Sequence, residues 1–227
     1  MNFGEQNWQQ IEEYLKHDDR VMLVLGACEQ HASLSLLTDS KIPLALAEAA
    51  SQQTGVLVAP PLHFGISPYF LSYPGTISLK STTYLFMVED IVRSLYGHGF
   101  KHILILNGHG GNTPAKTALV EFANDHPDLH MRWYAWWLSP AVGEFAKAHG
   151  LEMAHANWEE NFTFTRIGDA PRGVKPRVVD LNISGKDETR KHAGDGSYGG
   201  AYQVDDAIMQ EMFDLCLCEV LALLKFE

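Results

Sequence analysis

A short apolar run that stops in a glycine-rich turn limits the folds open to this chain. Residues 103–106 are Ile-Leu-Ile-Leu, and residues 107–112, Asn-Gly-His-Gly-Gly-Asn, follow at once. Such a run is typical of a strand buried in a parallel sheet, and glycine and asparagine residues end it. Open α/β sheets bind their ligands beyond the carboxyl ends of the strands. His109, the histidine of this turn, is therefore expected at a ligand-binding edge of a sheet.

The whole chain alternates between strand-like and helix-like segments. Strands are predicted at residues 21–25, 56–58, 102–106 and 129–137, and helices at residues 8–15, 38–53, 81–96, 114–124, 140–149, 157–166 and 204–226. Residues 168–200 are rich in glycine and are predicted to be mostly loop. This alternation favours a mostly parallel sheet with helices on both faces. A length of 227 residues suits a single domain spanning residues 1–227.

The composition disfavours several classes of partner. The formal net charge of −11 argues against binding to nucleic acids, which depends on Lys and Arg contacts to phosphates, and against docking on anionic membranes. No apolar run reaches the ~18 residues that span a bilayer. The first residues lack the basic-then-apolar pattern of a signal peptide. Cys28, Cys216 and Cys218 form no CxxC pair, as expected for reduced thiols, so a cytoplasmic protein is predicted.

A second group of polar residues follows the first predicted strand. Glu29 and His31 lie two positions apart, so both side chains point to the same side of an extended segment. Asp39 begins the next predicted helix, where its carboxylate can turn back toward the strand ends. With His109 these residues form a mixed set of imidazole and carboxylate groups, which suits Zn²⁺, Mn²⁺ or Fe²⁺ in a catalytic site. Asp39 could bridge two metal ions.

A third segment carries His155, Glu159 and Glu160. His155 and Glu159 are four positions apart, on one face of a predicted helix. One of the two carboxylates would complete the shell of a second metal ion, and His155 would move a proton during catalysis. A surface helix with an acidic N-terminus is the plain structural alternative. The glycine-rich turn has its own alternative, a cradle for a phosphate group at a helix N-terminus.

Taken together, these segments resemble the creatininase (creatinine amidohydrolase) family. The motifs that carry the resemblance are spread over residues 20–215: Glu29-Gln30-His31 with Thr38-Asp39, YPGTISL at residues 73–79, NGHGGN at residues 107–112, HANWEE at residues 155–160, and the glycines of residues 194–200. The resemblance implies a three-layer α/β/α sandwich with a mostly parallel central sheet, a centre of two metal ions, and often a hexamer. Members of the family hydrolyse cyclic amides, formamides or small peptides.

The resemblance also implies roles for individual residues. The two ions would share five protein ligands: Glu29 and His109 on one, His31 and Glu160 on the other, and Asp39 on both. The expected ions are zinc paired with zinc, manganese or iron. His155 and Glu160 are the predicted catalytic residues.

One departure from the family pattern bears on the substrate. Gly111 stands where creatinine-cleaving members have a Glu, so Glu160 must serve the second ion and a substrate other than creatinine is favoured. Aromatic side chains are expected to line an apolar substrate pocket: Tyr69, Phe70, Trp136 and Trp158. The predicted function is hydrolysis of a small amide C–N bond by a metal-activated water, in a homo-oligomer that is a hexamer by family resemblance. The alternatives are a catalytically inactive binding protein of the same fold and a phosphate- or nucleotide-ester enzyme that uses the glycine-rich turn.

Overall fold

The computed structural model describes residues 1–178 and 184–227. At its centre four parallel strands form a sheet in the order β2-β1-β3-β4. The strands are β1 (Arg20–Leu25), β2 (Leu57–Val58), β3 (His102–Asn107) and β4 (His130–Ala135). The chain passes from β1 to β2 on one side and then returns to β3 on the other side, so the strand order reverses between β1 and β3. Open α/β sheets bind ligands at such a reversal.

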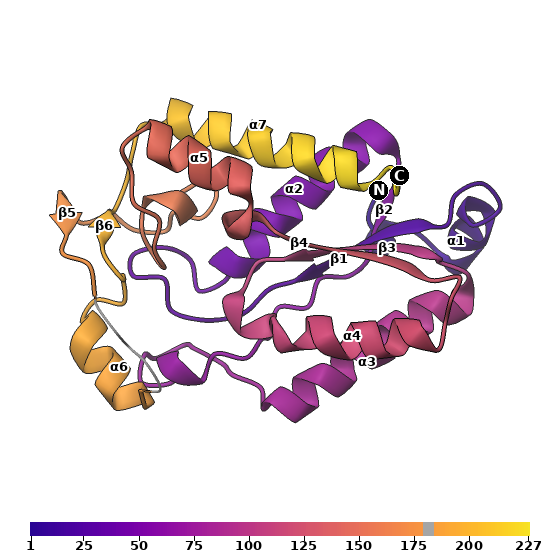
Figure 1. Ribbon diagram of the computed structural model, residues 1–227, viewed down its shortest axis with the longest axis horizontal. Coiled ribbons are helices and arrows are strands. Elements are labelled where there is room, and N and C mark those ends of the chain that lie inside the picture. Colours follow the sequence, from indigo (N-terminus) through magenta and orange to yellow (C-terminus); the bar gives the residue numbers. More distant parts are fainter. Residues whose placement is uncertain (179–183) are drawn as a thin grey trace.

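Helices cover both faces of the sheet (Figure 1). One face carries α2 (Thr38–Thr54), α5 (Pro140–Ala148) and α7 (Asp206–Leu223), and the other carries α1 (Trp8–Tyr14), α3 (Ser81–His98) and α4 (Pro114–Asn124). The predicted fold class, a three-layer α/β/α sandwich around a mostly parallel sheet, is confirmed. In the parts of the chain that the structure describes, no helix is long and apolar enough to cross a membrane.

The interiors of β1 and β3 are apolar because both of their faces are covered. Along β1, Met22 and Val24 belong to the core beneath α2, α5 and α7, whereas Val21 and Leu23 belong to the core beneath α3 and α4. The side chains of β3 alternate between the same two cores. A continuous apolar run is what a strand with two buried faces requires. The run that was expected to be a buried parallel strand therefore lies at the middle of the molecule.

Shorter elements complete the described chain. The 3₁₀ helices are η1 (Phe3–Glu5), η2 (Pro68–Phe70), η3 (Gly110–Asn112), η4 (Trp136–Leu138) and η5 (Trp158–Glu160). The strands β5 (Val174–Lys175) and β6 (Gly200–Ala201) pair antiparallel, and α6 (Lys186–Ala193) packs against η2. The elements β5, β6 and α6 lie beyond the carboxyl ends of the central strands (Figure 1).

Two segments differ from the predictions made from the sequence. The helix predicted at residues 157–166 is wrong: Asn157 caps the start of η5, but only this short 3₁₀ helix forms, because the backbone leaves the helical region at Asn161 (φ −87°, ψ 53°). In the predicted loop, α6 is an additional helix, with acidic residues in its first turn and basic residues in its last. The sequence of α6 is almost entirely polar, so no apolar periodicity marks this segment as a helix. Residues 179–183 of that predicted loop lie outside the described residues.

Candidate metal centre

The loop after β1 carries Glu29 and His31 into the interior. Each residue is 1 % exposed. The N–H of Glu29 donates to Leu36 O (2.9 Å), which ties two parts of the loop together. Ala32 has a left-handed backbone (φ 51°) that turns the chain directly after His31, and its N–H donates to Gln30 Oε1 (3.1 Å). The loop conformation is therefore set by local hydrogen bonds on both sides of the two side chains.

Asp39 lies between two histidines. It sits in the first turn of α2 and is 3 % exposed. Its Oδ1 lies 2.9 Å from His31 Nε2, and its Oδ2 lies 3.0 Å from His109 Nδ1. The N-cap residue of α2 is Leu37, which makes no side-chain capping bond. One carboxylate thus presents one oxygen to each imidazole, which is the arrangement that a bridging ligand requires.

The glycine-rich turn brings His109 against the start of α2. Gly108 makes this approach possible, because a Cβ atom at that position would lie 1.8 Å from Asp39 O. The Nε2 atom of His109 lies 2.9 Å from Ile66 O. A carbonyl only accepts, so Nε2 carries the proton there. The Nδ1 atom is left to face the carboxylates, with Glu29 Oε1 at 3.4 Å.

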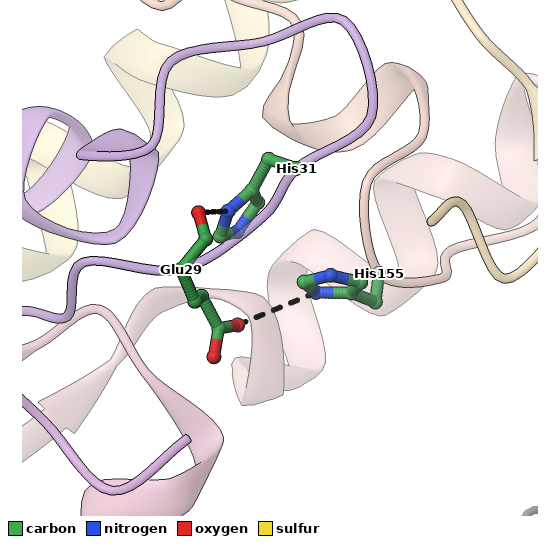
Figure 2. Close-up of side chains that lie close together, drawn as sticks. All are labelled: Glu29, His31 and His155. Carbon is green, nitrogen blue, oxygen red and sulfur yellow. Dashed lines mark hydrogen bonds and ion pairs between the residues drawn. The ribbon is translucent and has the colours of Figure 1, made fainter. Parts of the chain in front are cut away.

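In His31 the roles of the two ring nitrogens are the reverse of those in His109. Its Nδ1 donates to the backbone carbonyl of Glu29 (3.1 Å; Figure 2). Its Nε2 faces Asp39 and also Glu160 Oε1, the latter at 3.5 Å. In both histidines, therefore, a backbone carbonyl orients the ring and leaves the other nitrogen free for a metal ion, as is usual for histidine ligands.

The five predicted ligands lie in two overlapping clusters. Glu29, Asp39 and His109 form one cluster, and His31, Asp39 and Glu160 form the other. Within each cluster the ligand atoms lie within 4.8 Å of one another. In the described residues, Glu29 Oε2 is buried without a hydrogen-bond partner, and His31 Nε2 and Asp39 Oδ2 are buried with ion-pair contacts only. Buried polar atoms normally have partners, so this donor set fits a pair of divalent cations that share Asp39.

The electrostatics of the clusters favour positive charge. Burial opposes protonation of His31, but the carboxylates of Asp39 and Glu160 hold its pKa well above the ordinary value. Burial acts likewise on His109, yet Glu29 and Asp39 raise the pKa of His109 to about 9. Burial raises the pKa of Glu29 to about 7, although His109 opposes the change. Protons on the histidines thus balance the buried carboxylates, and metal cations could replace those protons.

His155 lies at the side of the two clusters. Its Nδ1 is 3.8 Å from Glu29 Oε1 (Figure 2), and its ring stacks on Phe70 with 4.6 Å between the centroids. Glu29, His31 and His155 form a third cluster with metal-ligand spacing. Burial, together with the neighbouring His31, lowers the pKa of His155 to about 4. His155 is therefore neutral at pH 7 in this environment.

The two neighbouring glutamates occupy different positions. Glu160 presents Oε1 to His31, and its Oε2 accepts a hydrogen bond from the N–H of Ala156 (2.6 Å). Glu160, and not Glu159, thus has the position of the second ion's ligand. The helical face predicted for His155 and Glu159 is wrong, because Ala156 between them has a left-handed backbone (φ 55°) that an α-helix excludes.

A cleft of about 340 Å³ opens onto the clusters. Four aromatic residues line it: Tyr69, Phe70, Trp137 and Tyr198. Tyr69 and Phe70 are among the residues predicted for a substrate pocket, whereas the other two predicted residues, Trp136 and Trp158, are at most 2 % exposed and pack in the core. Trp136 and Trp137 are adjacent in η4, directly after β4, and only Trp137 reaches the cleft. Tyr198 lies in a glycine-rich loop, where no periodic pattern marks it.

The cleft is acidic, which argues against a metal-free phosphate cradle at the glycine-rich turn. Four carboxylates line it, Glu29, Asp39, Glu159 and Glu160, and its lining residues include no Lys or Arg. Carboxylates repel a phosphate unless cations intervene. Packing also explains why a glycine stands at position 111, since a Cβ atom there would lie 2.0 Å from Ile66 O.

The chain is similar in sequence to known proteins. The model of the family described as Creatininase: Creatinine amidohydrolase matches residues 4–224. A creatinine amidohydrolase of Pseudomonas putida is 34% identical over 117 residues, which are 48% of this chain and 45% of that protein. A 3-dehydro-scyllo-inosose hydrolase of Thermotoga maritima is 28% identical over 138 residues, 58% of this chain and 44% of that protein. The matched segments thus span less than half the length of these curated relatives.

Solved structures share the fold over nearly the whole chain. A crystal structure of creatininase has a TM-score of 0.78 and 21% identity, with 97% of this chain and 95% of that chain covered. Other solved creatininases of the same fold include a Zn–Zn form and a manganese form. At this level of identity the likeness establishes the fold.

Proposed function

The chain belongs to the creatininase family, and from that premise we propose that it is a metal-dependent hydrolase of a small amide C–N bond. The observation that carries the proposal is Asp39, whose two oxygens face His31 and His109 at 2.9 and 3.0 Å. The substrate class is a cyclic amide, a formamide or a similar small amide. The proposed ions are two, zinc paired with zinc, manganese or iron.

Five side chains would hold the ions: Glu29 and His109 on one side, His31 and Glu160 on the other, and Asp39 between them. Bound divalent cations at such a site lower the pKa of a water and polarise a carbonyl group. The chain contributes preorganisation, because the imidazoles are oriented by backbone carbonyls before any ligand arrives.

His155 would handle the proton of the reaction. It lies at the cleft, held by stacking on Phe70, with Nδ1 toward Glu29. A ring so placed can take a proton from the attacking water or give one to the leaving nitrogen. The aromatic walls of the cleft would exclude bulk water from the reacting groups and so strengthen the electrostatic interactions there.

Metal analysis of the purified protein tests the proposal. We expect one to two transition-metal ions per chain in the native protein, and their loss in Asp39→Ala. The matched control is Asp90→Ala, which removes an exposed carboxylate on α3 and should keep the metal. Circular dichroism would show whether each variant is folded. Full metal content in a folded Asp39→Ala protein would contradict the bridging role. A native protein without metal, and without activity on a panel of amides after Zn²⁺ or Mn²⁺ is added, would favour the inactive binding protein.

A further inference from the structure

Tyr198 is a tyrosine of the cleft to which the proposed chemistry assigns no role. It lies in the glycine-rich segment of residues 194–200, lines the cleft and is half-buried. Among the described residues its hydroxyl has no hydrogen-bond partner, although tyrosine hydroxyls usually find one when they are buried. Other tyrosine hydroxyls of the chain donate to carbonyl or carboxylate oxygens: Tyr14, Tyr73, Tyr96, Tyr134 and Tyr202. The hydroxyl of Tyr198 is therefore available to a ligand in the cleft.

The position of Tyr198 is fixed through its backbone. Its N–H donates to His155 O (2.9 Å), and its carbonyl oxygen accepts from the N–H of Val178 (2.9 Å). Gly196 lets the same segment pass close to Gln30, because a Cβ atom on Gly196 would lie 1.7 Å from Gln30 Oε1. A side chain on so constrained a segment can meet a ligand atom at a set position, because little ordering is needed on binding.

The ring of Tyr198 lies beside the groups proposed to carry the reaction. Its centroid is 5.1 Å from that of the His155 ring and 5.8 Å from that of the Phe70 ring. Burial, and next the negative charge of Glu29, raise the pKa of the Tyr198 hydroxyl above its ordinary value. The hydroxyl thus keeps its proton at pH 7 and can serve as a hydrogen-bond donor in the cleft.

An amide substrate needs such a donor in this cleft. The lining residues include no Lys or Arg, and four of them are acidic: Glu29, Asp39, Glu159 and Glu160. When water attacks an amide, negative charge grows on the carbonyl oxygen, and a donor aimed at this oxygen lowers the barrier. The free hydroxyl of Tyr198 is a neutral donor of the required kind.

We propose that Tyr198 is a catalytic residue whose hydroxyl donates a hydrogen bond to the carbonyl oxygen of the substrate amide. The inference rests on the proposed function, because it requires the amide to lie at the metal positions. The hydrogen bond strengthens as charge develops on the oxygen, so it stabilises the transition state more than the bound substrate. The proton stays on the Tyr198 oxygen throughout.

Acetohydroxamate tests this on the Zn²⁺-loaded protein, because it binds metal and carries an oxygen that can accept the hydrogen bond. In Tyr198→Phe, which keeps the ring and loses only the hydroxyl, we expect calorimetry to show about tenfold weaker binding of acetohydroxamate. Imidazole binds Zn²⁺ through nitrogen and offers no oxygen, so it should bind both proteins alike. On an amide that the native protein cleaves, kcat should fall by about 10²-fold while KM changes little.

The matched control is Tyr202→Phe, which removes a hydroxyl that is bonded to Asp195 and does not line the cleft. This control should bind acetohydroxamate as the native protein does. Equal acetohydroxamate affinity of the native protein and Tyr198→Phe would overturn the inference, and so would an equal loss of affinity for both probes, which indicates a damaged metal site. A native protein that binds no Zn²⁺ would contradict the proposed function and, with it, the role of Tyr198.

Discussion

Asp39 shows how much depends on individual atoms in this molecule. A carboxylate in the first turn of a helix usually serves the helix by facing its free N–H groups. Here the two oxygens face two imidazoles from different parts of the chain, His31 and His109. The same residue type at the same helix position has thus taken on a different role, because the histidines of two loops converge on it.

The role of His155 can be separated from metal binding. In His155→Asn we expect unchanged metal content and a kcat lowered by about 10²–10⁴-fold, since proton transfer is lost while the five proposed ligands stay. Steady-state kinetics on an amide that the native protein cleaves, combined with metal analysis, measures both. His149→Asn, an exposed histidine at the end of α5, is the control. Loss of metal from His155→Asn would instead make His155 a ligand of the third cluster.

The raised pKa of His109 predicts a pH-dependent metal affinity. This pKa, about 9, is above the ordinary value, so Nδ1 is protonated at pH 7 and a metal ion must displace that proton. Affinity should therefore rise with pH by up to about tenfold per unit per proton displaced, and level off above pH 9. Calorimetry of Zn²⁺ binding at pH 7, in buffers of different ionisation heat, should detect proton release. Binding without proton release would contradict the prediction.

At the scale of elements, the turn between β3 and α4 is held by its own amides. Asn107 Nδ2 donates to His109 O (2.8 Å), and Asn112 Nδ2 donates to Gly26 O (3.0 Å) and to Asn107 Oδ1 (3.2 Å). These bonds join the turn to the end of β1. The two strand ends are therefore connected around the site by hydrogen bonds as well as by the sheet.

Two adjacent glycines of that turn should respond differently to substitution. A Cβ atom on Gly111 would lie 2.0 Å from Ile66 O, whereas a Cβ atom on Gly110 would meet nothing within 4 Å. We expect Gly111→Ala to lower the free energy of unfolding by about 1–3 kcal/mol through overpacking. Gly110→Ala, the control, should change it by about 0.5 kcal/mol or less. Urea unfolding measures both, and equal effects would contradict the packing argument.

At the scale of the whole molecule, the site joins three distant stretches of the chain. Glu29, His31 and Asp39 come from the segment between β1 and α2, His109 follows β3, and Glu160 follows α5. Metal ions that bind all three stretches would stabilise the folded chain, since the unfolded chain cannot hold the ligands together. The predictions of a homo-oligomer and of a cytoplasmic location stay predictions.

Thermal unfolding should reveal this stabilisation. At a free Zn²⁺ concentration of 100 times Kd, binding adds about 2.7 kcal/mol to the folded state. For a chain of this size the corresponding rise in Tm is about 5–10 °C. Scanning calorimetry with Zn²⁺ or with a chelator measures the difference, and Asp39→Ala should abolish it while Asp90→Ala keeps it. An equal Tm with metal and with chelator in the native protein would contradict the prediction.

The sequence by itself determined the layers and the identity of the clustered residues. Alternating strand and helix periods predict a parallel sheet between helices, and residues such as Glu29 and His109 follow strand ends that must meet at one edge. What depends on contacts between distant segments was decided by the tertiary structure alone. Trp158 belongs to the core and Trp137 to the cleft, because packing and not residue type selects the face. Likewise only the tertiary structure distinguishes Glu160, which faces His31, from the adjacent Glu159, which lines the cleft without a partner for its Oε2 among the described residues.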